Sequence, residues 1–481
     1  MPDSLIVLGA SGDMARRLLF PAVYQLDRAG KLDSLRIVGY ALEDWDTDRF
    51  RAEVKRGVTE LAGLDLDGAV WQRFSDRLTY LTGDLKDEGL AQLAQHVDGN
   101  VAFYLALPPG MFAAAATALA HAGFNETSKG WRRLVIEKPF GVDVDSAAEL
   151  NKELHQSWDE DQIFRIDHYL GKETVQNILV FRMANRVMDP MLNATQVEYV
   201  QLTASETLGL EGRYRYYDGI GAMRDMLQSH LLQLMTLTTM EPMTTWDSEI
   251  LHDHKVEVLR SIRPFTPETV RTCAVRGQYT SGTIGGQPVP GYLEEQGIPP
   301  SSTTETFAAL KLYIDNWRWQ GVPFYVRSGK RMATDLTEVA ITFREPPTSV
   351  FVDGESVVRE RNSLVFQLKP SEAITLSVLA REPGLELKSH GLKLYADYAP
   401  SQSESSSYEQ LLLDVIEGDR TSFLRFDGVE WAWRVLQPVI DAWSHGKPET
   451  YVAGSKGPEG QDRLMNPGQS WRPLSINSEK P

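Results

Sequence analysis

Several ionisable side chains crowd into one short stretch of this sequence, RIDHYLGKE at residues 165–173. His168, Tyr169 and Lys172 stand just before a helical pattern, where together they could donate several hydrogen bonds to a phosphate group. A solvated helix cap is the alternative interpretation of the same residues. The residue types therefore indicate a candidate anion site without deciding between the two.

A second group of candidates lies inside the apolar pattern 217–240, in the stretch RDMLQSH at residues 224–230. Asp225 and His230 are five residues apart, roughly 140° around an α-helix, so we expect them to flank a site rather than to stack. A histidine in such a helix is more often a satisfied core residue than a catalyst. Lys138, at the end of a predicted strand, could face a ligand crevice or be an ordinary surface lysine.

A glycine-containing turn follows the first apolar run of the chain. Glycine lets the backbone turn tightly, and it lets a pyrophosphate approach a helix N-terminus, where unpaired N–H groups favour negative charge. The spacing is GxxGxxA rather than GxGxxG, so the prediction depends on the position of the motif at the first strand-to-helix junction. The motif comprises Gly9, Ala10, Ser11, Gly12, Asp13, Met14 and Ala15.

A proline pair ends the fourth predicted strand. Leu107, Pro108 and Pro109 stand at the carboxyl end of that strand, which is where parallel sheets bind ligands. A simple turn formed by the prolines explains the sequence equally well.

The elements that must position the glycine turn and the proline pair alternate along the first 165 residues. Apolar runs at 4–10, 35–42, 77–84, 100–107 and 132–139 are predicted strands, and helical patterns lie between them at 46–60, 88–97 and 111–122. Strands that alternate with helices indicate βαβ units and a parallel sheet. We therefore predict a Rossmann-like α/β dinucleotide-binding domain over residues 1–168.

The remainder of the chain has a different pattern. Helical patterns at 171–184 and 217–240 precede strand-like runs at 305–314, 322–328, 338–344, 363–369 and 373–380. Many strands with little helix between them favour a large, mostly antiparallel sheet, hence an α+β domain over 169–481. Residues 281–302 are predicted to form a long loop, and the segment after about 453 to be irregular.

Composition excludes several classes of protein. Of 481 residues, 42% are hydrophobic and 24% charged, as in folded soluble proteins, and no apolar run is long enough for a membrane helix. We expect no signal peptide and, because Cys273 is the single cysteine, no internal disulfide and no multi-cysteine metal site. The net charge of −17 makes nucleic acid and anionic membranes poor partners. These features fit a cytoplasmic protein.

The sequence resembles the glucose-6-phosphate dehydrogenase family over nearly its whole length. The matching blocks occur in the family order, and RIDHYLGKE is close to unique to that family. The resemblance implies a dinucleotide-binding domain followed by a substrate-binding and oligomerisation domain. The blocks are GASGDMARR, EKPFG, RIDHYLGKE, EGRYRYYDGIGAMRDMLQSHLLQ, ETFAALKLYIDNWRWQGVPFYVRSGKR and SYEQLLLDVIEGD.

The resemblance implies a role for each candidate residue. His230 matches the general base that removes the proton from the C1 hydroxyl, and Asp167 matches the carboxylate that orients it. His168, Tyr169 and Lys172 match ligands of the phosphate. The remaining substrate residues are Glu206 and Asp225, which match acceptors for sugar hydroxyls, and Lys138 and Lys330, which match substrate lysines. No metal is expected.

The resemblance also implies a nicotinamide cofactor, NADP or NAD, held by the glycine motif, Arg16, Pro108 and Lys138. At Leu42 the family commonly has an arginine that pairs with the 2′-phosphate of NADP. Leucine cannot do so, and Glu43 or Asp44 could accept hydrogen bonds from a free ribose hydroxyl, so we predict good use of NAD. Arg16, Arg17 and Ser11 could still reach a 2′-phosphate, and residues 42–44 could equally be a solvated helix start.

Other departures from the family concern charge. Leu18 replaces a usual lysine, Asp335 a usual basic residue, and Lys369, before Pro370, a usual glutamine. We predict that Asp335 and Lys369 form an ion pair near the sugar site, although drift in a peripheral shell is an alternative.

The expected function is oxidation of glucose 6-phosphate at C1 to 6-phosphoglucono-1,5-lactone with hydride transfer to NAD(P), the first step of the oxidative pentose phosphate pathway of glucose metabolism. Two alternatives remain: the same chemistry on another modified hexose, or a nicotinamide-binding regulatory protein without turnover. The expected partners are a sugar phosphate and further copies of the chain, as a dimer or tetramer.

Overall fold

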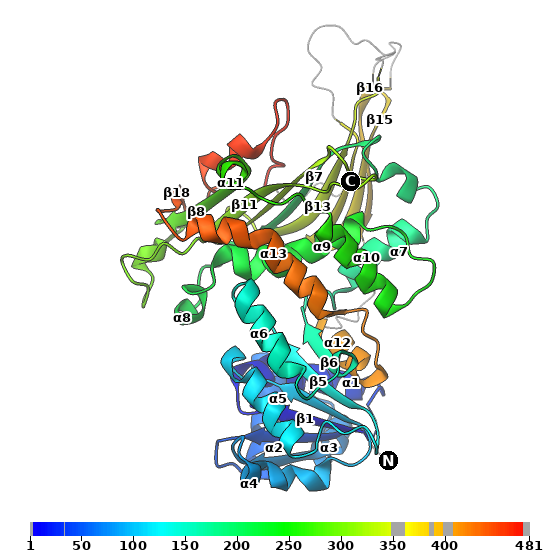
Figure 1. The fold of residues 1–481 in the computed structure, drawn as a ribbon, viewed down its shortest axis with the longest axis vertical. Helices are drawn as coiled ribbons and strands as arrows, with labels where there is room; N and C mark the ends of the chain where they lie inside the picture. The colour runs from blue at the N-terminus through cyan, green and yellow to red at the C-terminus, as the bar shows by residue number, and fades with distance from the viewer. Residues whose placement is uncertain (1–2, 33, 348–360, 384–388, 398–406, 475–481) are drawn as a thin grey trace. The chain divides into compact units, whose positions relative to one another are not determined.

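A computed structural model describes residues 3–32, 34–347, 361–383, 389–397 and 407–474. The chain divides into two compact units (Figure 1). Unit 1 comprises residues 1–173, 246–252 and 402–430, and unit 2 comprises 174–245, 253–401 and 431–481. The sequence-based boundary at 168/169 differs from this division because two later segments join the first unit.

Unit 1 is built on a parallel sheet with the strand order β3-β2-β1-β4-β5-β6, as predicted for a Rossmann-like domain. The short strand β17 (Phe423–Leu424) adds an antiparallel edge beside β6. Strands β6 and β17 were not predicted from the sequence. The parallel strands are β1 (Ser4–Leu8), β2 (Arg36–Ala41), β3 (Leu78–Thr82), β4 (Val101–Leu105), β5 (Arg132–Glu137) and β6 (Ile163–Ile166).

Helices follow these strands and bury their apolar faces against the sheet. The core between them combines aliphatic strand residues such as Val7 and Ile37 with aromatic residues such as Phe20 and Phe50. The helices are α1 (Phe20–Arg28), α2 (Thr47–Arg56), α3 (Gly68–Asp76), α4 (Asp87–Leu90), α5 (Phe112–His121), α6 (Val144–Leu154) and α12 (Ser407–Glu417).

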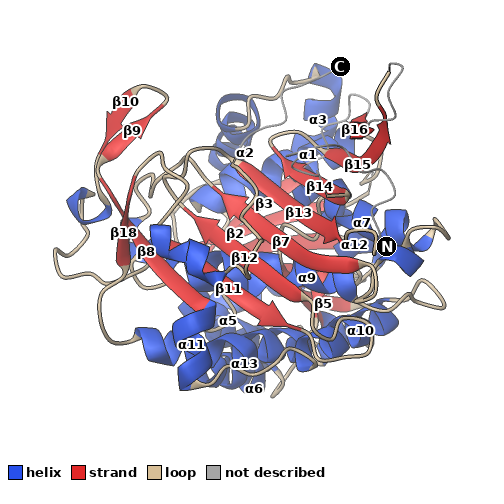
Figure 2. Cartoon of the chain, turned by 90° about the horizontal axis from the view of Figure 1, so that it is seen from above, coloured by secondary structure: helices blue, strands red, loops and turns tan. Residues whose placement is uncertain are grey.

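Unit 2 is built on a nine-stranded sheet, and Figure 2 shows its central strands side by side. The β7–β12 and β8–β18 pairs are parallel and the other neighbouring pairs are antiparallel, which confirms the predicted mostly antiparallel sheet. In sheet order the strands are β16 (Ser389–Asp397), β15 (Ala373–Arg381), β14 (Ser363–Lys369), β13 (Leu336–Phe343), β7 (Val197–Ser205), β12 (Pro323–Gly329), β11 (Phe307–Tyr313), β8 (Ala274–Thr280) and β18 (Glu449–Val452).

A π-helical segment, η7 (Met223–Leu231), continues into α9 (Leu232–Thr239) and packs on β7, β11 and β12. The other helices with residues in this unit are α7 (Glu173–Met183), α8 (Tyr214–Tyr217), α10 (Ser248–Arg260), α11 (Pro267–Cys273), α13 (Phe426–Trp443) and the 3₁₀ segment η9 (Glu459–Leu464).

The prediction of a long loop at 281–302 is wrong in part. It contains a hairpin of β9 (Gly282–Ile284) and β10 (Gln287–Val289). Gly285 and Gly286 connect the two strands with φ values of +56° and +79°. Two consecutive positive φ values are what a tight hairpin turn requires, and glycine adopts them without steric cost.

Candidate active site

The glycine turn predicted after the first strand is present in unit 1. Gly9 has a φ of +83°, and a Cβ added there would lie 2.3 Å from the backbone oxygen of Ala106. The backbone N–H of Gly12 donates to the backbone oxygen of Gly9 at 2.9 Å, and the chain is helical from Asp13 onward. Only glycine fits this close approach, so the turn retains the open backbone that a pyrophosphate needs.

The turn lies beside the end of β4. The backbone N–H of Ala106 donates to the backbone oxygen of Leu8 at 2.9 Å, which joins the ends of β1 and β4. Leu107 and Pro108 follow directly. The strand order reverses between these two strands, so Gly9 and Pro108 flank the crevice where doubly wound sheets bind nucleotides.

Ser11 and Glu43, two residues that were predicted to lie near the ribose of the cofactor, contact each other. The Ser11 hydroxyl donates to the Glu43 carboxylate, and the side chain of Leu42 is 70% exposed. Leu18, one of the departures from the family pattern, is also exposed.

The two arginines after the glycine motif also have acidic partners. Arg16 forms an ion pair with Glu53 at 3.2 Å, and Arg17 one with Asp13 at 2.6 Å. Each arginine that could hold a 2′-phosphate therefore has a carboxylate beside it.

Lys138 follows Glu137, the last residue of β5. The Glu137 carboxylate accepts hydrogen bonds from the hydroxyls of Tyr104, at 2.5 Å, and Tyr408, at 3.1 Å. Burial raises the pKa of the Glu137 carboxyl, and these two donors oppose that shift. The backbone that presents Lys138 is thus fixed by side chains from β4 and α12.

The predicted phosphate ligands lie together in the turn between β6 and α7. Asp167 is fully buried, and its Oδ1 accepts the backbone N–H of Tyr169 at 3.0 Å. The rings of His168 and Tyr169 are 5.2 Å apart, and the ammonium of Lys172 lies 4.4 Å from the centre of the Tyr169 ring. Three hydrogen-bond donors are therefore gathered at one helix start.

His230 and Asp225 both lie on η7 in unit 2, and His230 is 1% exposed. In a π-helix the backbone bonds link residues five apart, so positions 225 and 230 lie nearly one above the other. The expected separation of roughly 140° was therefore wrong, because it assumed α-helical geometry. That the two side chains border one site stays a prediction.

Glu206 and Lys330 follow two neighbouring parallel strands, β7 and β12. The backbone N–H of Glu206 donates to the backbone oxygen of Gly329 at 2.9 Å, which aligns the two strand ends. The Lys330 ammonium forms an ion pair with the Glu206 carboxylate at 2.5 Å and lies 5.3 Å from the centre of the Tyr217 ring.

The Asp225 carboxylate influences two of the three tyrosines of α8, Tyr216 and Tyr217. Burial is the largest cause that raises the pKa of both side chains, and the Asp225 carboxylate is the second. Together they raise the pKa of Tyr216 to about 12 and the pKa of Tyr217 well above its ordinary value. Tyr217 also lies beside Lys330, so Asp225, Lys330 and Glu206 surround the same part of unit 2.

Glu305 was missed by the sequence analysis. Its buried carboxylate accepts the backbone N–H of Met223 at 3.0 Å, and its backbone oxygen accepts that of Ala222 at 3.0 Å. It thereby holds the first turn of η7. Gly221 has a φ of +71°, and a Cβ there would lie 2.3 Å from the Glu305 carboxylate. The only sequence signal was an acidic residue at the start of an apolar strand.

The predicted ion pair between Asp335 and Lys369 does not form. Both oxygens of Asp335 accept hydrogen bonds from Thr207, one from its backbone N–H at 3.0 Å and one from its hydroxyl. Lys369 is exposed at the end of β14, opposite Thr337. The nearby donors of Thr207 satisfy the Asp335 carboxylate locally.

Nearly the whole chain matches proteins of one family. Residues 6–177 match the model described as glucose-6-phosphate dehydrogenase, NAD binding domain, and residues 179–472 match its C-terminal domain. A glucose-6-phosphate 1-dehydrogenase of Treponema pallidum is 43% identical, over 96% of this chain and 93% of that protein. Glucose-6-phosphate 1-dehydrogenase 2 of Mycobacterium tuberculosis is 40% identical, over 98% and 94%.

Two solved structures are similar over nearly the full length. A glucose-6-phosphate 1-dehydrogenase from Mycobacterium avium has a TM-score of 0.86 and 34% identity, covering 99% of this chain and 100% of the other. A glucose-6-phosphate dehydrogenase in complex with its substrate has a TM-score of 0.90 and 33% identity, covering 98% and 99%.

Proposed function

This chain belongs to the glucose-6-phosphate dehydrogenase family, and on that premise we propose that it oxidises glucose 6-phosphate at C1 to 6-phosphoglucono-1,5-lactone. Unit 2 supplies the support for the sugar half of the reaction: a buried histidine on the same helical segment as Asp225, and the Glu206–Lys330 pair at two strand ends. That arrangement is the observation that carries the proposal. The reaction would begin the oxidative pentose phosphate pathway.

In the proposed reaction His230 acts as the general base. Its imidazole takes the proton of the C1 hydroxyl while the C1 hydrogen leaves as hydride and the C1–O bond becomes a carbonyl. Glu206 and Asp225 accept hydrogen bonds from sugar hydroxyls, and Lys330 donates one. We assign Asp167 as the carboxylate that orients His230, as the family resemblance implies.

We assign the phosphate group to His168, Tyr169 and Lys172. A phosphate offers three acceptor oxygens, and the cluster at the start of α7 offers donors from all three side chains. The stacking of Lys172 on Tyr169 restricts the lysine before the phosphate arrives, which reduces the entropy lost on binding.

The nicotinamide cofactor, when bound, accepts the hydride. The residues of unit 1 fit a dinucleotide because Gly9 and Gly12 leave the backbone open at the switch point, beside Pro108. Asp13, Met14 and Ala15 form the helix start that faces a pyrophosphate, and Lys138 stands at the end of β5.

We further propose that this chain uses NAD well, and better than family members that have an arginine at the position of Leu42. Glu43, bonded to Ser11, can accept the hydroxyls of an unphosphorylated ribose, whereas it repels a 2′-phosphate. The carboxylates beside Arg16 and Arg17 weaken the attraction of those arginines for a phosphate.

One steady-state experiment tests these assignments. Reduction of NAD and of NADP is followed by absorbance with glucose 6-phosphate, with glucose and with a panel of modified hexoses. We expect turnover with glucose 6-phosphate, little with glucose, and a kcat/KM for NAD at least comparable to that for NADP. Turnover with another hexose but not with glucose 6-phosphate would identify that hexose as the substrate. Absence of turnover with every sugar tested would support a regulatory protein.

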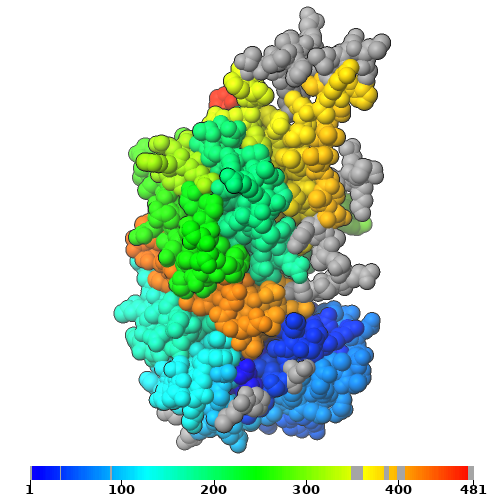
Figure 3. All heavy atoms as spheres, turned by 90° about the vertical axis from the view of Figure 1, so that its right-hand side faces the viewer, coloured from blue at the N-terminus to red at the C-terminus, as the bar shows by residue number. Residues whose placement is uncertain are grey.

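We also propose a homo-oligomer and a cytoplasmic location. Apolar side chains on β15 and β16, including Leu379, Leu392 and Leu394, are 40% exposed or more, and Figure 3 shows these strands in gold at the surface. Light scattering on the purified chain tests for a dimer or tetramer, and cell fractionation tests the location. No helix in the described ranges is long and apolar enough to cross a membrane.

A further inference from the structure

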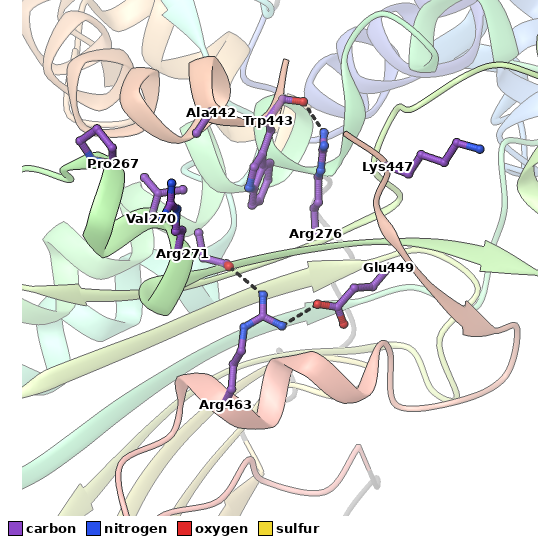
Figure 4. Close-up of a pocket in the computed structure, with 10 residues that line it drawn as sticks. Pro267, Val270, Arg271, Arg276, Ala442, Trp443, Lys447, Glu449 and Arg463 are labelled. Atoms are coloured by element: carbon purple, nitrogen blue, oxygen red, sulfur yellow. Dashed lines mark hydrogen bonds and ion pairs between the residues drawn. The ribbon is translucent and has the colours of Figure 1, made fainter. Parts of the chain in front are cut away.

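A cavity of about 440 Å³ lies at the β18 edge of unit 2, away from every residue assigned above (Figure 4). Its volume lies within the range of small-molecule sites, roughly 300–1,000 Å³. The apolar part of its wall consists of Pro267 and Val270 from α11, Ala274 from β8, and Ala442 and Trp443 from the end of α13.

Two of the arginines that line this cavity have partners within unit 2. Arg276 donates to the backbone oxygens of Trp443, of His445 at 2.6 Å and of Gly446 at 3.0 Å, which closes the C-terminal end of α13. Arg463 donates to the Glu449 carboxylate at 2.5 Å, as the dashed line in Figure 4 marks. These contacts give both arginines partners within unit 2.

Arg271 and Lys447 differ from these two arginines. Within the described ranges neither side chain has a hydrogen bond or an ion pair, and the electrostatic partner of Arg271 is the solvent-exposed carboxylate of Glu268, whose pKa hydrogen bonds from Thr266 and its own backbone, and then Arg271, hold below the ordinary value. In Figure 4 Arg271 lies beside Val270, and Lys447 stands at the rim with its side chain directed away from the indole. Four cationic side chains and one carboxylate line the cavity, so positive charge is in excess here although the whole protein carries −17.

We propose that this cavity binds a small organic phosphate that carries a flat ring. The ring contacts Trp443 and Val270, because an indole offers a large apolar surface for stacking. Arg271 contacts the phosphate, since a guanidinium matches two phosphate oxygens at once, and Lys447 closes on it from the rim. A neutral ligand would leave the positive charge unpaired, and a bare inorganic ion would leave the apolar wall uncovered.

Calorimetry with phenyl phosphate as the probe tests this site. Saturating glucose 6-phosphate and NADH are present throughout, which fills both sites proposed above without turnover. We expect saturable binding of one phenyl phosphate per chain, with inorganic phosphate and phenol at least about tenfold weaker, because each lacks one half of the contact. Absence of saturable binding, or equal binding of inorganic phosphate, would overturn the proposal.

Variants locate the binding. Arg271→Glu is expected to weaken the binding of phenyl phosphate at least about tenfold. The double variant Arg271→Gln with Lys447→Gln should also weaken binding, and it does so without placing an acidic side chain near the C-terminal end of a helix. The matched control is Lys393→Glu, on the opposite edge strand β16, which should leave affinity within about twofold. Glucose 6-phosphate oxidation should be unchanged in all of them. Equal affinity in the Arg271 and Lys393 variants would refute the site.

Discussion

Replacing Glu305 with alanine is expected to loosen the first turn of the helical segment that carries Asp225 and His230. The substitution removes the acceptor of the Met223 N–H, a hydrogen bond of 3.0 Å in a buried setting. Leaving that donor unpaired costs about 1–3 kcal/mol. The bond from Ala222 to the backbone oxygen of residue 305 remains, so the loss is local.

Hydrogen exchange of the peptide that contains Met223 measures this loss directly. A cost of about 1–3 kcal/mol corresponds to exchange roughly 5- to 150-fold faster. Glu305→Gln keeps an acceptor oxygen at the same position, so it should recover most of the protection and most of the kcat that Glu305→Ala loses. Glu338→Ala is the matched control, because it removes a buried carboxylate of β13 that bonds Arg472 instead.

The charge of Glu305 adds a dependence on pH. Burial raises the pKa of this carboxyl in the folded state, so the stability it contributes is full below its unfolded pKa and falls as pH rises through the folded value. Glu305→Gln has no such loss, so its free energy of unfolding should rise relative to that of the wild type as pH rises above about 4.3, the ordinary pKa of a glutamate. Unchanged exchange at Met223 in the alanine variant, or equal damage from glutamine and alanine, would refute the reasoning.

Four further outcomes are expected. His230→Asn should lower kcat at least about a hundredfold with little change in KM, and near wild-type kcat in steady-state assays would remove its assignment as the base. Lys172→Ala should act mainly on the KM for glucose 6-phosphate, by about 2–3 kcal/mol in kcat/KM; equal damage with unphosphorylated glucose would contradict a phosphate role. Leu42→Arg and Glu43→Gln should each move the kcat/KM ratio toward NADP, the arginine by about tenfold or more, whereas a wild type that already favours NADP a hundredfold would contradict the NAD proposal. Burial raises the pKa of Asp414 to about 6, so Asp414→Asn should gain up to about 3 kcal/mol over the wild type in thermal unfolding between pH 4 and pH 7, and a parallel pH dependence of the two would rule this out.

Local patterns were enough to predict much of this fold. The Gly9 turn and strands β1 to β5 depend on side chains close in sequence, so alternation of strand and helix revealed them. This alternation did not reveal strand β17, because its two residues, Phe423 and Leu424, form a strand only by pairing with Arg165 and Ile166. Contacts across such separations are set by tertiary packing rather than by propensity.

The candidate site was predicted by residue type better than by geometry. His230 and Asp225 were identified, but the π-helical turn that places positions 225 and 230 on one side of the helix leaves no periodicity signal. The Asp335–Lys369 pair failed because opposite charges were matched without knowledge of the donors of Thr207. Glu305 acts through backbone groups of a distant segment, which a single sequence does not display.

The discontinuous make-up of unit 1 has a consequence for biosynthesis. Arg133, on β5, donates to the backbone oxygens of Val415 at 2.5 Å and Ile416 at 2.8 Å, and Phe164 packs on Phe423 with ring centres 4.8 Å apart. These partners leave the ribosome roughly 250 residues after β6, about 10–50 s later at ordinary elongation rates of about 5–20 residues/s. During that interval the β6 edge and the surface under α12 are uncovered, so the nascent dinucleotide-binding unit must wait, or be held by a chaperone, until most of the chain has been made.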